Sequence, residues 1–271
     1  AEPAPVALLQ DSLVLQLPQN VGAWSYRLGL QRGGWMADLE YCGKINDPSA
    51  DNGYTYRGGE ALLASLGYST RGLGISLNAK TVDNMSFRAD RDLLLFDVPV
   101  SFIPAITKQH TYNLAATLYP YATVVSGESS ASAEVFYQIP RDTRLGGHYG
   151  TKIAIGYAAA NALDTTRLSG REGLIDGYTR NSWGFGRTKF VRDLNVSIER
   201  KLNKNWKLKY TYFNFQFNTL ATPVTTTFKG IVYADIHVLE TQVKTARRQS
   251  LRTELQALFT DEDKGDWGTV L

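Results

Sequence analysis

Histidine and carboxylate side chains are the first residues to test for chemistry, because they supply general bases, nucleophile partners and metal ligands. The chain has only three His residues, His110, His148 and His237. His110 and His148 each lie beside a predicted short turn, whereas His237 follows Asp235 by two residues on the same face of a predicted strand. An Asp/His pair could bind a metal or shuttle protons, but the ordinary polarity of a water-facing strand explains it equally well. We therefore predict no enzyme, no catalytic residues, no metal site and no cofactor.

Three further stretches contain residue types that occur in ligand-binding sites. Residues 46–53 gather oxygen ligands around a glycine but lack the spacing and the distal Glu of an EF-hand, which favours a surface loop. Gly184 and Gly186 have neither the helix nor the Lys of a phosphate-binding loop. Residues 83–91 combine mixed charges with Met85 and Phe87, a pattern typical of a loop that packs against its neighbours or folds into a channel mouth.

Composition limits the elements that could position these residues. The chain has 271 residues with 24 Gly, 15 Tyr and 11 Phe but only 2 Met, a mixture that favours strands and turns. The single Cys42 excludes an internal disulfide, and a net charge of +3 gives no reason to expect a nucleic-acid partner. No apolar run reaches the roughly 18 residues of a membrane helix. The first residues, AEPAP, have no signal-peptide character, so we expect a mature or trimmed start.

Alternation of apolar and polar residues predicts about a dozen strands, many of roughly 9 to 12 residues, which matches the length of tilted membrane-spanning strands. Short predicted turns at residues 32–34, 69–72, 141–147 and 201–205 alternate with longer polar loops at 43–59, 119–130, 161–188 and 218–227. Residues 83–110 are expected to form a long loop, one strand near 93–102 and a short turn. This alternation is typical of an all-β, antiparallel up-and-down transmembrane barrel with short periplasmic turns and long outer loops.

The same period of two also fits a soluble β-sandwich. The composition of the two strand faces must therefore distinguish a transmembrane barrel from a sandwich. The predicted lumen or constriction residues are charged or polar, and aromatic residues such as Trp35 and Trp206 lie near strand ends, where membrane girdles belong. These lumen candidates are Arg27, Asp38, Glu40, Lys80, Arg88, Arg91, Lys207, Lys209, Asp235, His237, Arg252 and Glu254. We interpret residues 21–271 as one barrel domain and leave residues 1–20 as a poorly assigned N-terminal segment.

Five strings in the chain carry a family resemblance. They are NDPSADNGY (46–54), GISLNAKTVDNMSFRADR (74–91), PAITKQHTYNLAATLYPYAT (104–123), LGGHYGTK (145–152) and SLRTELQALFTDEDKGDW (250–267). Together they resemble a Bacteroidota family of large outer-membrane β-barrel proteins of unknown function. The resemblance implies a location in the outer membrane of a Gram-negative bacterium and barrel sequence outside this chain; it brings no catalytic residues.

The functional expectation is a channel, or a membrane component of a surface transport or secretion assembly, in contact with outer-membrane lipid and with other outer-membrane or surface proteins. Two alternatives remain open: a plugged structural barrel whose long loops bind a partner or glycan, and a soluble β-sandwich binding module. Residues 261–266 are expected to turn into a short last strand at Trp267–Leu271, which would leave the barrel incomplete within this chain.

Overall fold

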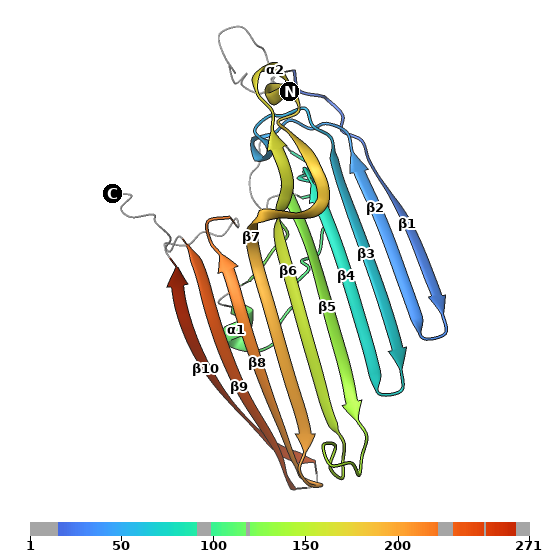
Figure 1. The fold of residues 1–271 in the computed structure, drawn as a ribbon, viewed down its shortest axis with the longest axis vertical. Helices are drawn as coiled ribbons and strands as arrows, with labels where there is room; N and C mark the ends of the chain where they lie inside the picture. Colours follow the sequence, from blue (N-terminus) through green and yellow to red (C-terminus); the bar gives the residue numbers. More distant parts are fainter. Residues whose placement is uncertain (1–15, 91–98, 118–119, 222–229, 247, 264–271) are drawn as a thin grey trace.

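The computed structural model describes residues 16–90, 99–117, 120–221, 230–246 and 248–263. These residues form one antiparallel sheet of ten strands in sequence order (Figure 1). The strands are β1 (Ala23–Arg32), β2 (Trp35–Lys44), β3 (Gly59–Thr70), β4 (Leu73–Asp83), β5 (Gly127–Ile139), β6 (Thr151–Arg167), β7 (Tyr178–Lys201), β8 (Trp206–Asn218), β9 (Ile231–Ala246) and β10 (Gln249–Asp263). The short helices are η1 (Ala50–Asn52), α1 (Asn113–Thr117) and α2 (Gly170–Ile175). The predicted all-β, up-and-down class is confirmed.

Short and long connections alternate from β1 to β5, as the sequence predicts, but the β5–β6 connection, residues 140–150, is no shorter than the β6–β7 connection, residues 168–177. At one end, β1–β2 and β3–β4 are joined by two-residue turns, in which Gly33 and Gly72 adopt the left-handed conformation that such turns require. At the other end, β2–β3 and β4–β5 are joined by residues 45–58 and 84–126. The hairpin of β6 and β7 is longer than expected, because its strands continue through register shifts into the predicted loop at 161–188.

The sheet is open within the described residues, where β1 and β10 each pair with a single neighbour. The described residues form ten strands, against the expected number of about a dozen. Residues 99–102 are not in a strand, and the rest of the strand expected near 93–102 lies outside the described residues. The short strand expected at 267–271 also lies outside them. No helix in the described part of the chain has the length and apolar character of a membrane-spanning helix.

The two faces of the sheet follow from the strand register, because residues paired across neighbouring strands point to the same side. The described parts of 84–126, which are residues 84–90, 99–117 and 120–126, lie against one side. We call that side the covered face and the other side the bare face. One row of register partners on the covered face runs through Arg27, Glu40, Leu63, Lys80, Ser130, Ala160, Val191, Phe217 and Val232.

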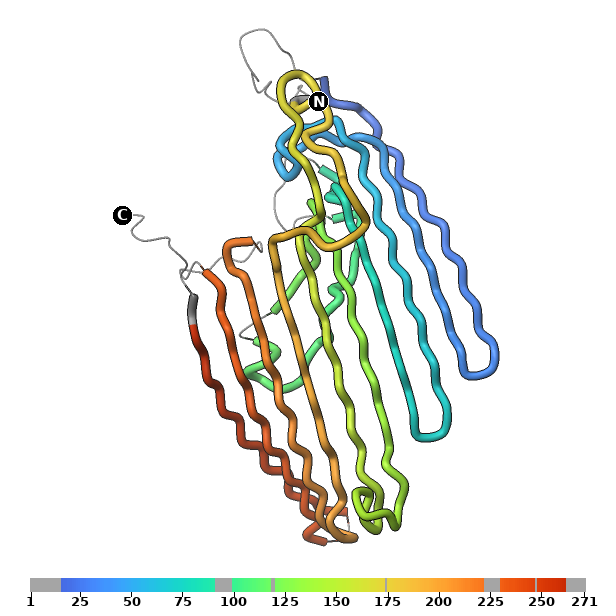
Figure 2. The backbone as a smooth tube through the Cα atoms, viewed as in Figure 1, coloured from blue at the N-terminus to red at the C-terminus, as the bar shows by residue number. Residues whose placement is uncertain are grey.

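The protein core lies between residues 84–126 and the covered face. Tyr112 and Ala115 pack with Phe213, Phe215 and neighbouring side chains of β8 and β9, while Met85 packs with Ala61 and Val82. Ile236, Val238 and Val82 are fully buried. This apolar contact explains why the segment stays on the sheet instead of projecting from the end of the β4–β5 hairpin (Figure 2).

The bare face is apolar and exposed. Leu28 is 71% exposed, Leu255 64% and Phe259 63%. Other exposed apolar residues of this face are Trp24, Tyr26, Leu30, Trp35, Leu39, Leu66, Leu77, Val135, Tyr137, Ile155, Tyr157, Ile198, Trp206, Tyr210, Leu239 and Leu251. An exposed apolar surface that extends from β1 to β10 is far larger than the patches found on soluble monomers.

Candidate functional site

Residues 84–126, which we call the plug, form the candidate functional region together with the covered face beneath them. The plug leaves the sheet at the end of β4 and returns at the start of β5, where Asp83 and Gly127 are register partners. Its described parts contact strands from β2 to β10. Three polar anchors and the apolar core hold it in place, and each anchor joins the plug to a different part of the sheet.

The first anchor is a buried ion pair between Lys80 of β4 and Glu128 of β5. The Lys80 Nζ atom lies 3.0 Å from Glu128 Oε1, and the two side chains are 2% and 0% exposed. Lys80 also donates to the carbonyl oxygen of Pro104 at 2.8 Å and to the Thr123 hydroxyl at 2.6 Å. Because a buried charge is stable only when it is paired and hydrogen-bonded, this lysine ties both limbs of the plug to the sheet.

Glu128 completes the same anchor from the other side. Its Oε2 atom accepts hydrogen bonds from the Tyr121 hydroxyl at 2.7 Å and from the Val124 backbone N–H at 2.9 Å. The Ser130 hydroxyl donates to Oε1 at 2.7 Å. Burial, reinforced by the negative charge of Glu128, raises the pKa of Tyr121 well above its usual range, so this hydroxyl remains a donor.

The second anchor joins His110 of the plug to Asp193 of β7. His110 Nε2 lies 2.7 Å from Asp193 Oδ2, and the side chains are 8% and 1% exposed. The imidazole packs edge-on against the rings of Phe213 and Phe215. Asn195 Nδ2 donates to the other carboxylate oxygen at 3.2 Å. The expectation that His110 lies beside a short turn was wrong, because this stretch crosses the sheet as part of the plug.

The third anchor extends to β9 and β10. The Tyr112 hydroxyl donates to Glu240 Oε2 at 3.3 Å, and the Leu114 backbone N–H donates to Gln256 Oε1 at 3.2 Å. Arg252 Nη2 pairs with the same Glu240 oxygen at 2.7 Å. The plug therefore crosses from β4 to the last described strand and is held at both sides of the sheet.

At its N-terminal end, the plug contacts the loop between β2 and β3. Arg88 Nη2 lies 2.8 Å from Asp51 Oδ2, and the Ser86 hydroxyl donates to the same carboxylate. Nearby, Arg57 pairs with Asp83 at 2.6 Å. Burial alone would lower the pKa of Arg57, but its hydrogen bond and ion pair with Asp83 outweigh that effect and raise it.

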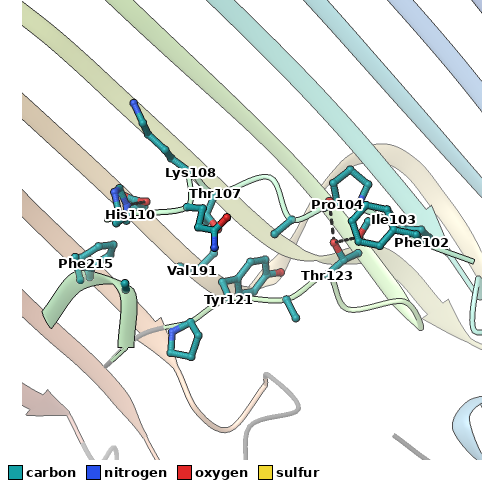
Figure 3. Close-up of a pocket in the computed structure, with 17 residues that line it drawn as sticks. Phe102, Ile103, Pro104, Thr107, Lys108, His110, Tyr121, Thr123, Val191 and Phe215 are labelled. Atoms are coloured by element: carbon teal, nitrogen blue, oxygen red, sulfur yellow. Dashed lines mark hydrogen bonds and ion pairs between the residues drawn. The ribbon is translucent and has the colours of Figure 1, made fainter. Parts of the chain in front are cut away.

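A slot of about 520 Å³ lies between the two limbs of the plug (Figure 3). Its floor is formed by Val191 and Asp193 of β7 and Phe215 of β8. The outgoing limb, residues 102–110, and the returning limb, residues 120–123, line its sides with α1. More than half of its lining residues are apolar, and its polar groups come from residues 107–110, from Tyr121 and Thr123, and from Asp193 in the floor.

Most predicted lumen residues lie on the covered face: Arg27, Asp38, Glu40, Lys80, Lys207, Lys209, Arg252 and Glu254. Many are paired with opposite charges or packed on rings. Arg27 pairs with Glu40, Lys207 lies 2.8 Å from Glu199, and Lys209 lies over the Tyr112 ring. Arg88 is ion-paired in the plug, and Arg91 lies outside the described residues.

Asp235 and His237 lie on the bare face, opposite to the position expected for lumen residues. The register pairs His237 with Tyr212, whereas Lys207 and Lys209 alternate with it on the other side. The Tyr212 hydroxyl and Asn214 Nδ2 donate to Asp235 Oδ1 at 2.5 and 2.8 Å, and the Tyr210 hydroxyl lies 2.7 Å from His237 Nδ1. Asp235 and His237 thus belong to a polar cluster, rimmed by tyrosines, within an apolar surface.

The remaining sequence candidates do not assemble a reactive centre. His148 lies at the β5–β6 turn and contacts Asp142 at 3.0 Å, with both side chains exposed. Residues 46–53 contain η1, and Asp51 from this stretch pairs with the plug. Among the described residues, no group of three or more His, Cys, Asp or Glu side chains could hold a metal ion.

The sequence reasoning missed the buried anchors because each joins residues far apart in the chain. His110 and Asp193 are separated by 83 positions, and nothing in the local pattern pairs them. One signal was available: the alternation of strand residues fails throughout 84–126, although the stretch keeps apolar residues such as Met85, Tyr112 and Leu114. An irregular stretch that keeps apolar residues is a candidate for packing inside the protein, because burial of those side chains is favourable.

Comparison with known proteins places this chain in a family. The model of the family of unknown function DUF6029 matches residues 9–271. The chain belongs to that family. No curated protein and no solved structure matches it. The family supplies no activity or site residue, so functional proposals for this DUF6029 member must rest on its faces, plug and slot.

Proposed function

We propose that this DUF6029 member forms the wall of an outer-membrane β-barrel with a resident plug, and that it serves as a membrane component of a surface transport or secretion assembly. The observation that carries the proposal is the contrast between the two faces of one sheet. The bare face presents exposed Leu, Trp, Tyr and Phe from nearly every strand, whereas the covered face carries charged residues and the packed plug. Apolar-out and polar-in alternation is the pattern of a membrane barrel.

Charge pairing on the covered face favours a barrel whose lumen is plugged over an open pore. Lys80 and Glu128 neutralise each other in the interior, as do Arg252 and Glu240 nearer the edge. The plug uses these groups and crosses the sheet to β10. An open channel needs polar groups that face water, so ion conduction in this protein requires the plug to move or to leave a passage beside it.

Barrel closure requires partners for the two outer strands. Inside hydrocarbon, an unpaired strand edge leaves backbone N–H and C=O groups unsatisfied at a cost of several kcal/mol each. β1 and β10 each have one neighbour among the described strands. We therefore propose that further strands, from the same polypeptide or from another outer-membrane protein, pair with these edges. Outer-membrane lipid and other surface proteins are the partners that this arrangement fits.

The family resemblance of strings such as NDPSADNGY supports a Gram-negative, Bacteroidota outer-membrane location. A soluble β-sandwich is less well supported, because it would need a second sheet over the bare face, and the described strands all belong to one sheet. The open-channel alternative keeps the same walls and differs only in whether the plug is fixed.

Single-channel recording on the native protein in a planar bilayer tests this proposal. We expect the wild-type protein to insert without a steady conductance. In a variant that joins Asp83 to Gly127 by an Asn-Gly turn, residues 84–126 are absent and conductance should appear, because those two residues are already register partners.

A second variant covers the case in which the shortened protein does not fold. Tyr112→Ala removes one aromatic ring and one anchor but keeps the chain length, so we expect brief openings at low frequency. A steady wild-type conductance that neither variant changes would contradict a resident plug.

A further inference from the structure

The slot between the limbs of the plug has the size and the walls of a small-molecule site. Its volume of about 520 Å³ lies within the range of roughly 300 to 1,000 Å³ found for ligand pockets. Ala105, Ala116 and Ala122 contribute side chains too small to fill it. Ala116 and Ala122 are exposed, so the slot opens to the surroundings of the plug.

The slot is built into the resting structure. The outgoing limb is fixed by the Pro104 carbonyl oxygen on Lys80 and by His110 on Asp193. The returning limb is fixed by Tyr121 on Glu128 and by Thr123 on Lys80. Because the same buried charges hold both limbs, a ligand entering the slot does not have to order its walls, and the entropic cost of binding is reduced.

One end of the slot offers polar groups without partners in the described protein. Asp193 accepts from His110 Nε2, which leaves Nδ1 of the same ring free of any hydrogen bond to a described residue. The Thr107 hydroxyl, on the same limb, also makes none. Figure 3 shows Thr107 and His110 on the outgoing limb, with Phe215 beside His110 and with Val191 and Tyr121 nearer the returning limb.

We propose that the slot binds an uncharged amphiphile, an aliphatic alcohol whose hydroxyl meets His110 Nδ1 and whose chain lies over Val191 toward Tyr121. A hydroxyl both donates and accepts, so it suits the ring whether or not Nδ1 carries a proton. A carboxylate or phosphate head would approach the buried charge of Asp193 and is disfavoured. This site goes beyond the proposed barrel function, because it depends on the plug and not on what covers the bare face.

Photolabelling of the purified native protein in amphipol tests the site, with a diazirine derivative of 1-decanol as the probe. We expect labelled peptides from residues 102–117 or from the β7–β8 floor, protected by unlabelled 1-decanol. Decanoate should protect about fivefold less well, the effect of one unfavourable polar contact. Ala116→Trp should abolish slot labelling, whereas Ala37→Trp on the bare face should leave it unchanged.

The His110→Gln variant tests separately whether His110 selects the hydroxyl head group of the ligand. The Gln amide can still donate to Asp193 but places no atom at the Nδ1 position, so we expect the difference between decanol and decanoate to shrink while slot labelling persists. Labelling confined to the bare face, labelling that Ala116→Trp does not affect, or equal protection by both competitors would each overturn the proposal.

Discussion

The covered face and the bare face are built from alternate residues of the same strands, and they differ in what their side chains meet. On the covered face of β9, Ile236 and Val238 are fully buried under the plug. On the bare face of the same strand, Leu239 is 42% exposed, and its register partners are Tyr210 and Leu255 of the same sheet. The comparison shows that both faces contain apolar residues but that only the covered face packs against another segment of the described chain, so composition alone does not identify the interior.

Polar groups sharpen the same comparison. On the covered face, Lys80 and Glu128 are satisfied by groups from the plug, which places their charges in the interior of the protein. On the bare face, the cluster of Asp235, His237 and three neighbouring side chains is satisfied within the sheet. The plug is therefore needed by the polar groups of one face and not by those of the other.

Of the substitutions predicted here, removal of one member of the buried ion pair should reduce the stability of the protein most. Glu128→Ala leaves the Lys80 charge buried without its partner, and we expect a loss of about 3 to 5 kcal/mol in the free energy of unfolding. Urea unfolding of the purified protein measures it. The double variant Lys80→Met, Glu128→Leu should lose less, because no charge remains buried; an equal loss in both variants would contradict the pairing.

A charge placed on each face tests whether the faces meet different surroundings. Val196→Lys points to the bare face and Ser197→Lys, its neighbour, to the covered face. In reconstituted protein, we expect the Val196→Lys variant to lose about 2 to 4 kcal/mol in stability and the Ser197→Lys variant to lose much less. Equal losses would argue against a lipid-facing surface.

Arg88 tests whether the plug entrance is a selectivity element or a contact. Its guanidinium is paired with Asp51 and 10% exposed, so Arg88→Ala should reduce stability by about 1.5 to 3 kcal/mol. It should not create a conductance in bilayer recordings. Arg88→Lys retains the charge and should lose less stability, and a change in ion selectivity without a stability loss would favour a constriction role.

The smallest predicted effect is a dependence of stability on alkaline pH. The pKa of Tyr121 is raised in the folded protein, so the folded state holds this proton where the unfolded chain, with a tyrosine pKa near 10, releases it. The associated stability is fully present below about pH 10 and declines as pH rises above it, by at most about 1.4 kcal/mol per pH unit. Unfolding measured from pH 9 to 11 should show a shallower decline for Tyr121→Phe than for the wild type.

Local periodicity predicted the strands well where both faces alternate. Trp206 and Leu208 were separated correctly from Lys207 and Lys209, because a period of two assigns neighbours to opposite sides. The same rule placed Asp235 and His237 on one face of their strand, but it could not predict whether that face is the one that carries Lys207. That depends on the pairing of β8 with β9 across a connection of 12 residues, 219–230, whose length the strand pattern does not determine.

The plug and its slot could not be predicted from local pattern. The Lys80–Glu128 pair joins neighbouring strands, but 43 residues separate those strands in the chain, and the intervening alternation is lost. His110 was recognised as a residue capable of chemistry, and its partner Asp193 was hidden among the polar residues of a strand. Tertiary packing on Phe213 and Phe215, rather than sequence spacing, brings these two groups together.

The central claim is that the bare face meets lipid while the covered face meets the plug, and quenching of a fluorescent label by brominated lipid tests it most directly. Cys42 is replaced by Ser, and single cysteines are introduced at the adjacent pairs Leu28/Arg27 and Leu255/Glu254, all of them exposed, for labelling in the reconstituted native protein. We predict strong quenching at positions 28 and 255 and weak quenching at 27 and 254. Equal quenching within each pair, or stronger quenching at 27 and 254, would contradict the account.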